Sequence, residues 1–109
     1  MKIIRDKQYL DELDTILDFI AKDSLNRAMK FLTEVDKRIN SIPLMPYKYR
    51  QSHYHDSIEV RDLIVKGYTI PYLIDEGRKT IVILDIFKWS DRKDDIDTIV
   101  RTMRKRREF

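Results

Sequence analysis

The two histidines of the chain stand two residues apart, in the stretch YKYRQSHYHDS from Tyr47 to Ser57. On an extended segment, His53 and His55 would share one side, where they could bind a metal ion or transfer a proton near neutral pH. The chain has no cysteine, and only Asp56 offers a third ligand nearby. These residues therefore favour acid–base chemistry over metal binding, and a solvated polar loop is the simplest interpretation. We predict no metal site and no cofactor.

Glu59 and Arg61 form a second candidate pair for chemistry. If Ile58 and Val60 face the helices, this pair points outward on an open sheet face, as a base and a phosphate clamp. Metal-free RNA cleavage needs a base for the 2′-hydroxyl, a cation for the phosphate and an acid for the leaving oxygen. A salt bridge between strands on a solvated face explains the same pair. The residues that a ribonuclease would use here are Glu59, Arg61, Arg50, His53 and His55.

Aromatic and cationic side chains alternate at Tyr47, Lys48 and Tyr49. This pattern suits the stacking of bases while cations hold phosphates, and it also suits the rim of a protein-binding surface. Trp89 follows an aliphatic run and could anchor a partner or cover the edge of the core. The basic C-terminal stretch RTMRKRREF could bind a partner or form a solvated helix end. The candidate binding residues are Tyr47, Lys48, Tyr49, Lys88, Trp89, Arg92, Arg104, Arg106 and Arg107.

The composition is that of one folded domain, which we expect to span residues 1–109. Hydrophobic residues make up 42% of the chain, and only 2 Gly and 3 Pro interrupt it. The 22 Lys and Arg outnumber the 19 Asp and Glu, and the net charge of +3 permits RNA, DNA or an acidic protein as a partner without requiring one. The chain lacks cysteine, a signal-peptide core and any run of about 18 apolar residues, which predicts a cytoplasmic protein that does not span a membrane.

The elements that must position these side chains begin with a short strand from Lys2 to Arg5. Two amphipathic helices follow, and Asp23 and Ser24 supply the break and the cap between them. So short a break predicts an antiparallel helical hairpin, which Pro43 ends. The apolar stripes are Leu10, Leu13, Ile16, Leu17 and Ile20 in the first helix, and Ala28, Phe31, Leu32, Val35, Ile39 and Ile42 in the second.

From Ile58 onward, three runs of β-branched and aromatic residues predict an antiparallel meander, with turns at Lys66-Gly67 and over Asp75 to Lys79. Pro71 cannot donate a hydrogen bond to a neighbouring strand, so we expect a bulge or a locally unpaired neighbour there. A last amphipathic helix is expected after Lys88. The predicted fold class is therefore α+β: a helical hairpin packed on one face of a small, twisted, mainly antiparallel sheet, with a C-terminal helix. The other sheet face is expected to be open.

The meander RDLIVKGYTIPYLIDEGRKTIVILDIFK, from Arg61 to Lys88, resembles the strand core of the RelE/ParE toxin superfamily. An arginine-bearing strand, a tight Gly-Tyr turn, a Tyr-containing strand with an acidic turn and a final aliphatic strand follow one another in the same order. The hairpin opening LDELDTILDFIAKDS and the later Pro-Tyr extend the resemblance over nearly the whole chain. It implies the toxin of a bacterial type II toxin–antitoxin pair, or plasmid stabilisation protein, which inhibits growth.

The superfamily divides into RelE-like ribonucleases, which cut mRNA on the ribosome, and ParE-like proteins, which poison DNA gyrase. The ribonuclease branch usually has an arginine directly after the Gly-Tyr, where this chain has Thr69, and an arginine or histidine just past the final strand, where it has Lys88 and Trp89. Asp95-Ile96 stands near the place of a later Tyr or His. The resemblance therefore slightly favours a ParE-like action on gyrase that is not enzymatic.

Two alternatives stay open. One is a ribosome-dependent mRNA endoribonuclease that needs no metal, and the other is an antitoxin-binding module that has lost its toxicity. In each case the resemblance implies a cognate antitoxin that docks in the groove of the helical hairpin and along the sheet edge, forming a toxin–antitoxin hetero-oligomer. The target would be gyrase, or the ribosome with its mRNA.

Overall fold

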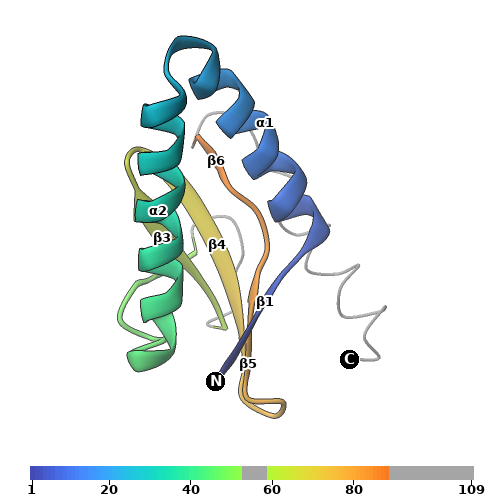
Figure 1. Cartoon of the computed structure of the whole chain (residues 1–109). Coiled ribbons are helices and arrows are strands. Elements are labelled where there is room, and N and C mark those ends of the chain that lie inside the picture. The colour runs from blue at the N-terminus through green and yellow to red at the C-terminus, as the bar shows by residue number, and fades with distance from the viewer. Residues whose placement is uncertain (53–58, 89–109) are drawn as a thin grey trace.

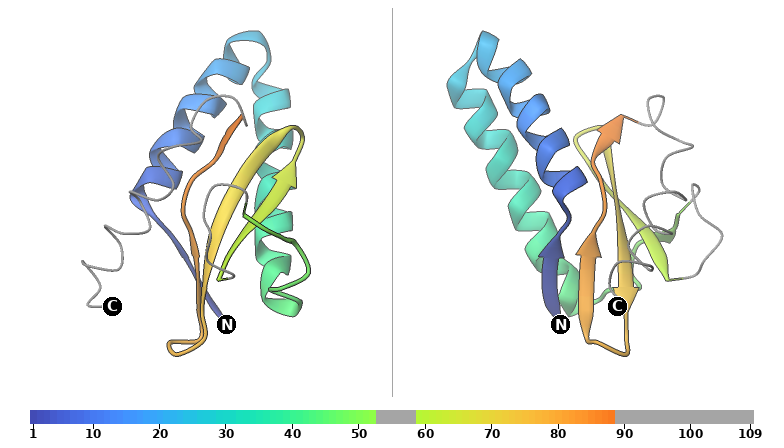
Figure 2. Two further views of the ribbon diagram at one scale, coloured as in Figure 1. Left: turned by 180° about the vertical axis from the view of Figure 1, so that it is seen from behind. Right: turned by 90° about the vertical axis from the view of Figure 1, so that its right-hand side faces the viewer.

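The computed structural model describes residues 1–52 and 59–88, which form one sheet with two helices on one of its faces (Figures 1 and 2). The helices lie side by side and cover the same side of the strands, so the described part has two layers. The elements are β1 (Lys2–Arg5), α1 (Lys7–Asp23), α2 (Leu25–Ser41), the 3-10 helix η1 (Ile42–Leu44), β2 (Arg50–Gln51), β3 (Val60–Val65), β4 (Tyr68–Asp75), β5 (Thr80–Ile83) and β6 (Phe87–Lys88).

Two polar side chains set the ends of the helical hairpin. The Asp6 carboxylate accepts a hydrogen bond from the Gln8 amide at 3.1 Å and caps α1. The Ser24 amide donates to the Ile20 carbonyl at the end of α1. The Ser24 hydroxyl accepts from the Arg27 amide at 3.2 Å and caps α2. One residue thus closes the first helix and opens the second. The two helices lie side by side in opposite directions, which confirms the predicted hairpin (Figure 1).

The sheet has the strand order β1-β5-β4-β3-β2, and β6 also pairs with β4. β1 runs parallel to β5, with Lys2 opposite Thr80 and Arg5 opposite Ile83. Every other pairing among the described residues is antiparallel. The predicted α+β class and the mainly antiparallel sheet are therefore confirmed, and the helical hairpin with η1 connects β1 at one edge of the strand order to β2 at the other.

The turn between β3 and β4 has two residues, as predicted. Lys66 and Gly67 both have positive φ, of 51° and 84°, between the paired residues Val65 and Tyr68. Two left-handed residues in a two-residue hairpin loop match the twist of the flanking strands. The second predicted turn, after Asp75, is also present, and there Lys79 has the positive φ, of 54°.

Pro71 lies opposite an extra residue in the neighbouring strand. The pairing of β4 with β5 ends at Tyr72 and Ile83, and its pairing with β6 begins at Thr69 and Phe87. Between these two pairs β4 has two residues, whereas the facing segment has three, Leu84 to Ile86. The Pro71 carbonyl accepts from the Leu84 amide at 2.9 Å, but proline has no amide hydrogen to return a bond. The predicted bulge is confirmed, and the extra residue lies in the segment between β5 and β6, to which Pro71 cannot donate a hydrogen bond.

Apolar residues from both layers form one core between the helices and the sheet. The core residues from the strands alternate, as one face of a sheet requires. The members with the largest fully buried side chains are Tyr9, Ile39, Ile42, Leu63, Ile70, Tyr72, Ile74, Ile81, Ile83 and Ile86.

The opposite sheet face is not open, so that expectation is wrong. Val60 lies opposite Leu73, which lies opposite Val82, and the three are 0%, 2% and 2% exposed. These strands carry apolar residues on both faces, which is typical of sheets buried on both sides. The predicted C-terminal helix lies outside the described residues.

Candidate functional site

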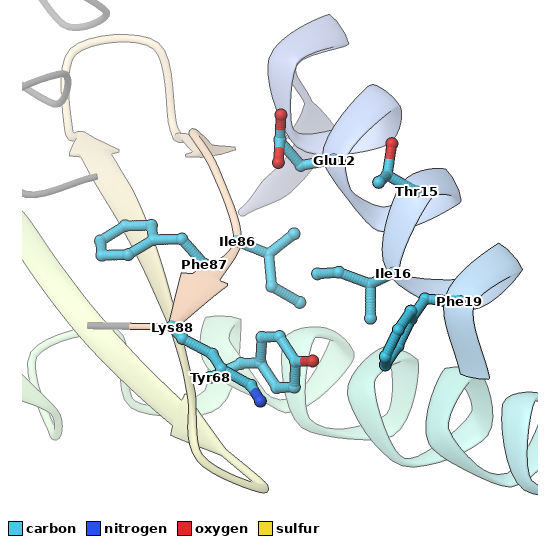
Figure 3. A pocket seen from close by; sticks show the side chains of 8 residues that line it. All are labelled: Glu12, Thr15, Ile16, Phe19, Tyr68, Ile86, Phe87 and Lys88. Atoms are coloured by element: carbon cyan, nitrogen blue, oxygen red, sulfur yellow. The ribbon is translucent and has the colours of Figure 1, made fainter. Parts of the chain in front are cut away.

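A cavity of about 340 Å³ opens between α1 and β6 (Figure 3). One wall is a row of α1 side chains at helical spacing, and the other is the start of β4 with the last residues before and within β6. The lining residues are Glu12, Thr15, Ile16, Phe19, Tyr68, Ile86, Phe87 and Lys88. We call this cavity the α1–β6 groove.

The Tyr68 ring at the floor of the groove makes two aromatic contacts. Lys88 and Tyr68 are directly opposite in the β4–β6 pair, and the Lys88 ammonium lies 5.5 Å from the centre of the Tyr68 ring. The Tyr68 ring also meets Phe31 of α2 edge to face at 5.3 Å. Tyr68 is thus packed against side chains of both layers, and Lys88 lines the groove next to it.

The helical wall of the groove exposes apolar surface. Phe19 is 70% exposed, although Ile16 one turn earlier is partly buried against the core. Figure 3 shows Ile16 and Phe19 on the side of α1 that faces Tyr68 and Ile86. An exposed aromatic ring beside an apolar cavity is typical of a surface that binds another protein.

A second cluster joins the segment after α2 to the sheet. Arg61 donates from Nη1 to the carbonyls of Tyr49, at 2.8 Å, and Tyr47, at 3.2 Å, and its guanidinium lies 5.1 Å from the Tyr47 ring centre. The Tyr72 hydroxyl donates to the Pro46 carbonyl at 2.6 Å. The Tyr47 hydroxyl donates to Glu76 at 2.9 Å. We call these contacts the tyrosine clasp.

The phenols of the clasp remain protonated donors near neutral pH. Burial raises the pKa of Tyr72, and the neighbouring Tyr49 raises it further. At Tyr47, burial and the hydrogen bond to Glu76 raise the pKa. Neither phenol is therefore placed to act as a base, and both serve to hold the segment against the sheet.

The face predicted for Arg61 is wrong. Arg61 lies opposite Tyr72 and shares its face with Leu63 and Val65, which pack in the core under the helices. It is Val60 that points to the other face. Since both faces of β3 carry apolar side chains, their alternation does not reveal which one the helices cover.

Arg50 and Arg61 do not come together. Arg50 lies opposite Asp62 and its guanidinium is 3.7 Å from that buried carboxylate, whereas Gln51 lies opposite Arg61. Neighbouring residues of a strand point to opposite faces, so the two arginines are on different sides of the sheet. Glu59 stands just before β3, where its carbonyl accepts from the Ile74 amide at 2.8 Å.

The remaining predicted residues are dispersed. Lys48 is exposed, and its ammonium lies 5.6 Å from the centre of the Tyr49 ring, next to the clasp. Lys88 is in the α1–β6 groove. The other predicted site residues lie outside the described part of the chain: His53, His55, Trp89, Arg92, Arg104, Arg106 and Arg107.

Sequence reasoning missed the helical wall of the groove. Phe19 stands beside the predicted apolar stripe of the first helix. It follows Ile16 by three residues and Glu12 by seven, and this helical spacing was the signal in the sequence that could have placed it on the same face.

Residues 1–52 and 59–88 contain no group of three histidine or acidic side chains that could hold a metal ion. Neither described helix has the length and apolar character needed to cross a membrane.

Comparison with known proteins agrees with this architecture. The family model for the ParE toxin of the type II toxin–antitoxin system parDE matches residues 3–93. A search of curated proteins finds no match. Among solved structures, a chain from the chromosomal ParDE toxin–antitoxin system of P. aeruginosa superposes with a TM-score of 0.65 and 18% identity, over 81% of this chain and 95% of that one. At this identity the superposition shows a shared fold.

Proposed function

The chain belongs to the ParE toxin family of type II toxin–antitoxin systems, and from this premise we propose that it stops bacterial growth by inhibiting DNA gyrase, without cutting RNA. It is the toxin of such a pair, and its partner is an antitoxin. We further propose that the antitoxin silences it by filling the α1–β6 groove.

The separation of Arg50 from Arg61 carries the proposal about the target. A metal-free ribonuclease must gather a base, a phosphate-binding cation and an acid around one phosphate. Here Arg50 pairs with Asp62 on one face of the sheet. Arg61 donates to two backbone carbonyls on the opposite face. Thr69, where a ribonuclease would carry a cation, is 3% exposed and supplies no charge. A binding action on gyrase needs no such cluster.

The groove supports the proposal about the antitoxin. Its walls are apolar at Ile16, Phe19 and Ile86, and Lys88 and Glu12 stand among them. An amphipathic helix that lays apolar side chains between α1 and β6 would cover Phe19 and bury the exposed ring. The outer edge of β1, the last strand on that side of the sheet order, would accept a further strand of the antitoxin.

Two assays on the full chain test the target. The purified protein should inhibit supercoiling of relaxed plasmid by purified DNA gyrase, and the cognate antitoxin should restore it. A map of transcript 5′ ends, taken minutes after induction in bacteria, should show no new ends within coding regions. New ends clustered in translated regions, with gyrase unaffected, would replace this proposal with ribosome-dependent cleavage. Unimpaired growth after induction would instead indicate an antitoxin-binding module without toxicity.

A further inference from the structure

The turn after α2 presents two large apolar side chains to solvent. Leu44 and Met45 are 84% and 62% exposed and stand between Pro43 and Pro46. Neither contributes much buried area to the fold, so the core does not explain why apolar residues occupy these positions. Adjacent exposed apolar side chains of this size are typical of anchors that enter a partner's pocket.

The backbone that carries the two side chains is fixed on both sides. The Met45 amide donates to the Ile42 carbonyl and the Lys48 amide to the Met45 carbonyl, both at 3.1 Å. Next to them, the Tyr72 hydroxyl holds the Pro46 carbonyl at 2.6 Å. A segment that is already ordered loses little entropy when it binds, so these contacts favour recognition.

The stretch of chain that carries the turn is positively charged, and Glu76, which accepts from the Tyr47 hydroxyl at 2.9 Å, is an acidic group close to it. Residues 37–55 contain no Asp or Glu, and they carry Lys37, Arg38, Lys48 and Arg50. Asp62 lies 3.7 Å from Arg50, and the other three cations give this stretch of the chain a net positive charge. A partner that fits this surface has an apolar pocket edged by carboxylates.

A protein fits this surface better than a nucleic acid does. Binding to DNA or RNA relies on cations directed at phosphates. Here Arg38 donates to the Ile64 carbonyl at 3.4 Å, Arg50 turns to Asp62, and Lys48 lies over the Tyr49 ring. Three of the four cations thus have a contact within the protein, and Leu44 is the most exposed large hydrophobic side chain of the described residues.

The turn and the α1–β6 groove are separate surfaces. Figure 1 shows the end of α2 at the far end of the helical hairpin from the α1–α2 connection, whereas Phe19 stands one turn before that connection. We propose that the Leu44–Met45 turn is the surface by which the toxin binds its target protein, inserting both side chains into an apolar pocket with an acidic rim. The identity of that target as gyrase rests on the proposed function.

A pair of matched double variants tests the inference. Leu44→Ser with Met45→Ser removes the proposed anchors, and Leu25→Ser with Met29→Ser makes the same chemical change at residues that are 69% and 54% exposed elsewhere. Each full-length variant is compared for growth arrest on induction, inhibition of purified gyrase, binding of the cognate antitoxin, and urea midpoint. We expect the first variant to lose gyrase inhibition by roughly tenfold or more, and the second to stay within about twofold.

The outcomes separate this inference from the proposed function. Equal toxicity of both variants overturns the inference alone, and so does loss of antitoxin binding with toxicity kept, which would assign the turn to the antitoxin. Binding of a duplex DNA probe by the unchanged chain, lost in the first variant, overturns it in favour of DNA. If the unchanged chain arrests growth without inhibiting gyrase, the gyrase proposal fails, and selective loss of arrest in the first variant still supports the inference.

Discussion

The hydroxyls of Tyr72 and Tyr9 are both buried, and only that of Tyr72 makes a hydrogen bond of good geometry, although Arg5 lies close to Tyr9. Tyr72 donates to the Pro46 carbonyl at 2.6 Å, whereas the Tyr9 hydroxyl makes no hydrogen bond among the described residues. Tyr72→Phe should therefore lower the free energy of unfolding by about 1 kcal/mol, and Tyr9→Phe should leave it unchanged or raise it. Urea unfolding of both variants measures the difference. An equal effect at the two positions would mean that the clasp does not stabilise the fold.

The same two residues make stability depend on pH in the alkaline range. Burial, aided by the charge of Asp36, raises the pKa of Tyr9 to about 12 from its ordinary value of 10.0, and burial also raises the pKa of Tyr72. Above pH 10 the unfolded chain releases these protons and the folded chain retains them, so stability falls as pH rises through this range. The free energy of unfolding should drop between pH 10 and 12. Tyr9→Phe should make that drop smaller, and an unchanged slope would contradict the assignment.

Phe19 tests the proposed role of the groove. Phe19→Ser removes an apolar ring that is 70% exposed, so we expect little change in stability and a loss of antitoxin affinity of about tenfold or more. Leu10→Ser is the matched control, because Leu10 is exposed on the same helix but does not line the groove. Calorimetric titration with the cognate antitoxin measures both. Equal affinities for the two variants would place the antitoxin elsewhere.

At the scale of single elements, the β3–β4 turn depends on one glycine. Gly67 has a φ of 84°, and a Cβ atom there would meet nothing within 4 Å, so a side chain would be strained only by the backbone conformation. Gly67→Ala should cost about 1–2 kcal/mol of stability. Gly77 has no left-handed φ, and its added Cβ would make an ordinary 3.6 Å contact with Asp75. Thermal unfolding should therefore show Gly77→Ala close to the unchanged chain, and equal costs would contradict the argument.

Elements set by local chemistry could be predicted from the sequence. Ser24 marked both the end of α1 and the start of α2, Lys66-Gly67 marked the tight turn, and Pro71 marked the bulge. Each of these signals acts through hydrogen bonds or φ values within a few residues, so a single sequence contains it.

Features that depend on packing between distant segments could not be predicted. β3 is apolar on both faces, so the sequence did not show that Arg61 lies under the helices with Tyr72 opposite it. The groove also depends on packing between distant segments. Phe19 and Lys88 are 69 positions apart in the sequence, and only the packing of α1 beside β6 brings them to one cavity. The family resemblance predicted an antitoxin partner and a groove at the helical hairpin, but of the residues that line the α1–β6 groove only Lys88 was among the predicted binding residues.

At the scale of the whole molecule, charge is distributed unevenly between the two proposed surfaces. α1 carries five acidic residues against two lysines, a net charge of −3, and residues 37–50 carry four cations and no acid. A basic antitoxin segment would therefore be attracted to the acidic surface of α1. A target protein with acidic groups would be attracted to the basic stretch at the Leu44–Met45 turn. The two partners should respond to opposite charge changes on the toxin.

Charge reversal on each surface tests this separation. Asp14→Lys with Asp18→Lys, both exposed on α1, should slow antitoxin association several-fold at low salt, because rim charges act mainly on the encounter rate, and should leave gyrase inhibition unchanged. Lys48→Glu should weaken gyrase inhibition and leave antitoxin association unchanged. Stopped-flow association at two salt concentrations and a supercoiling assay measure the two effects. If either change impaired both activities equally, a single shared surface would bind both partners, and the antitoxin would act by covering the residues that contact the target.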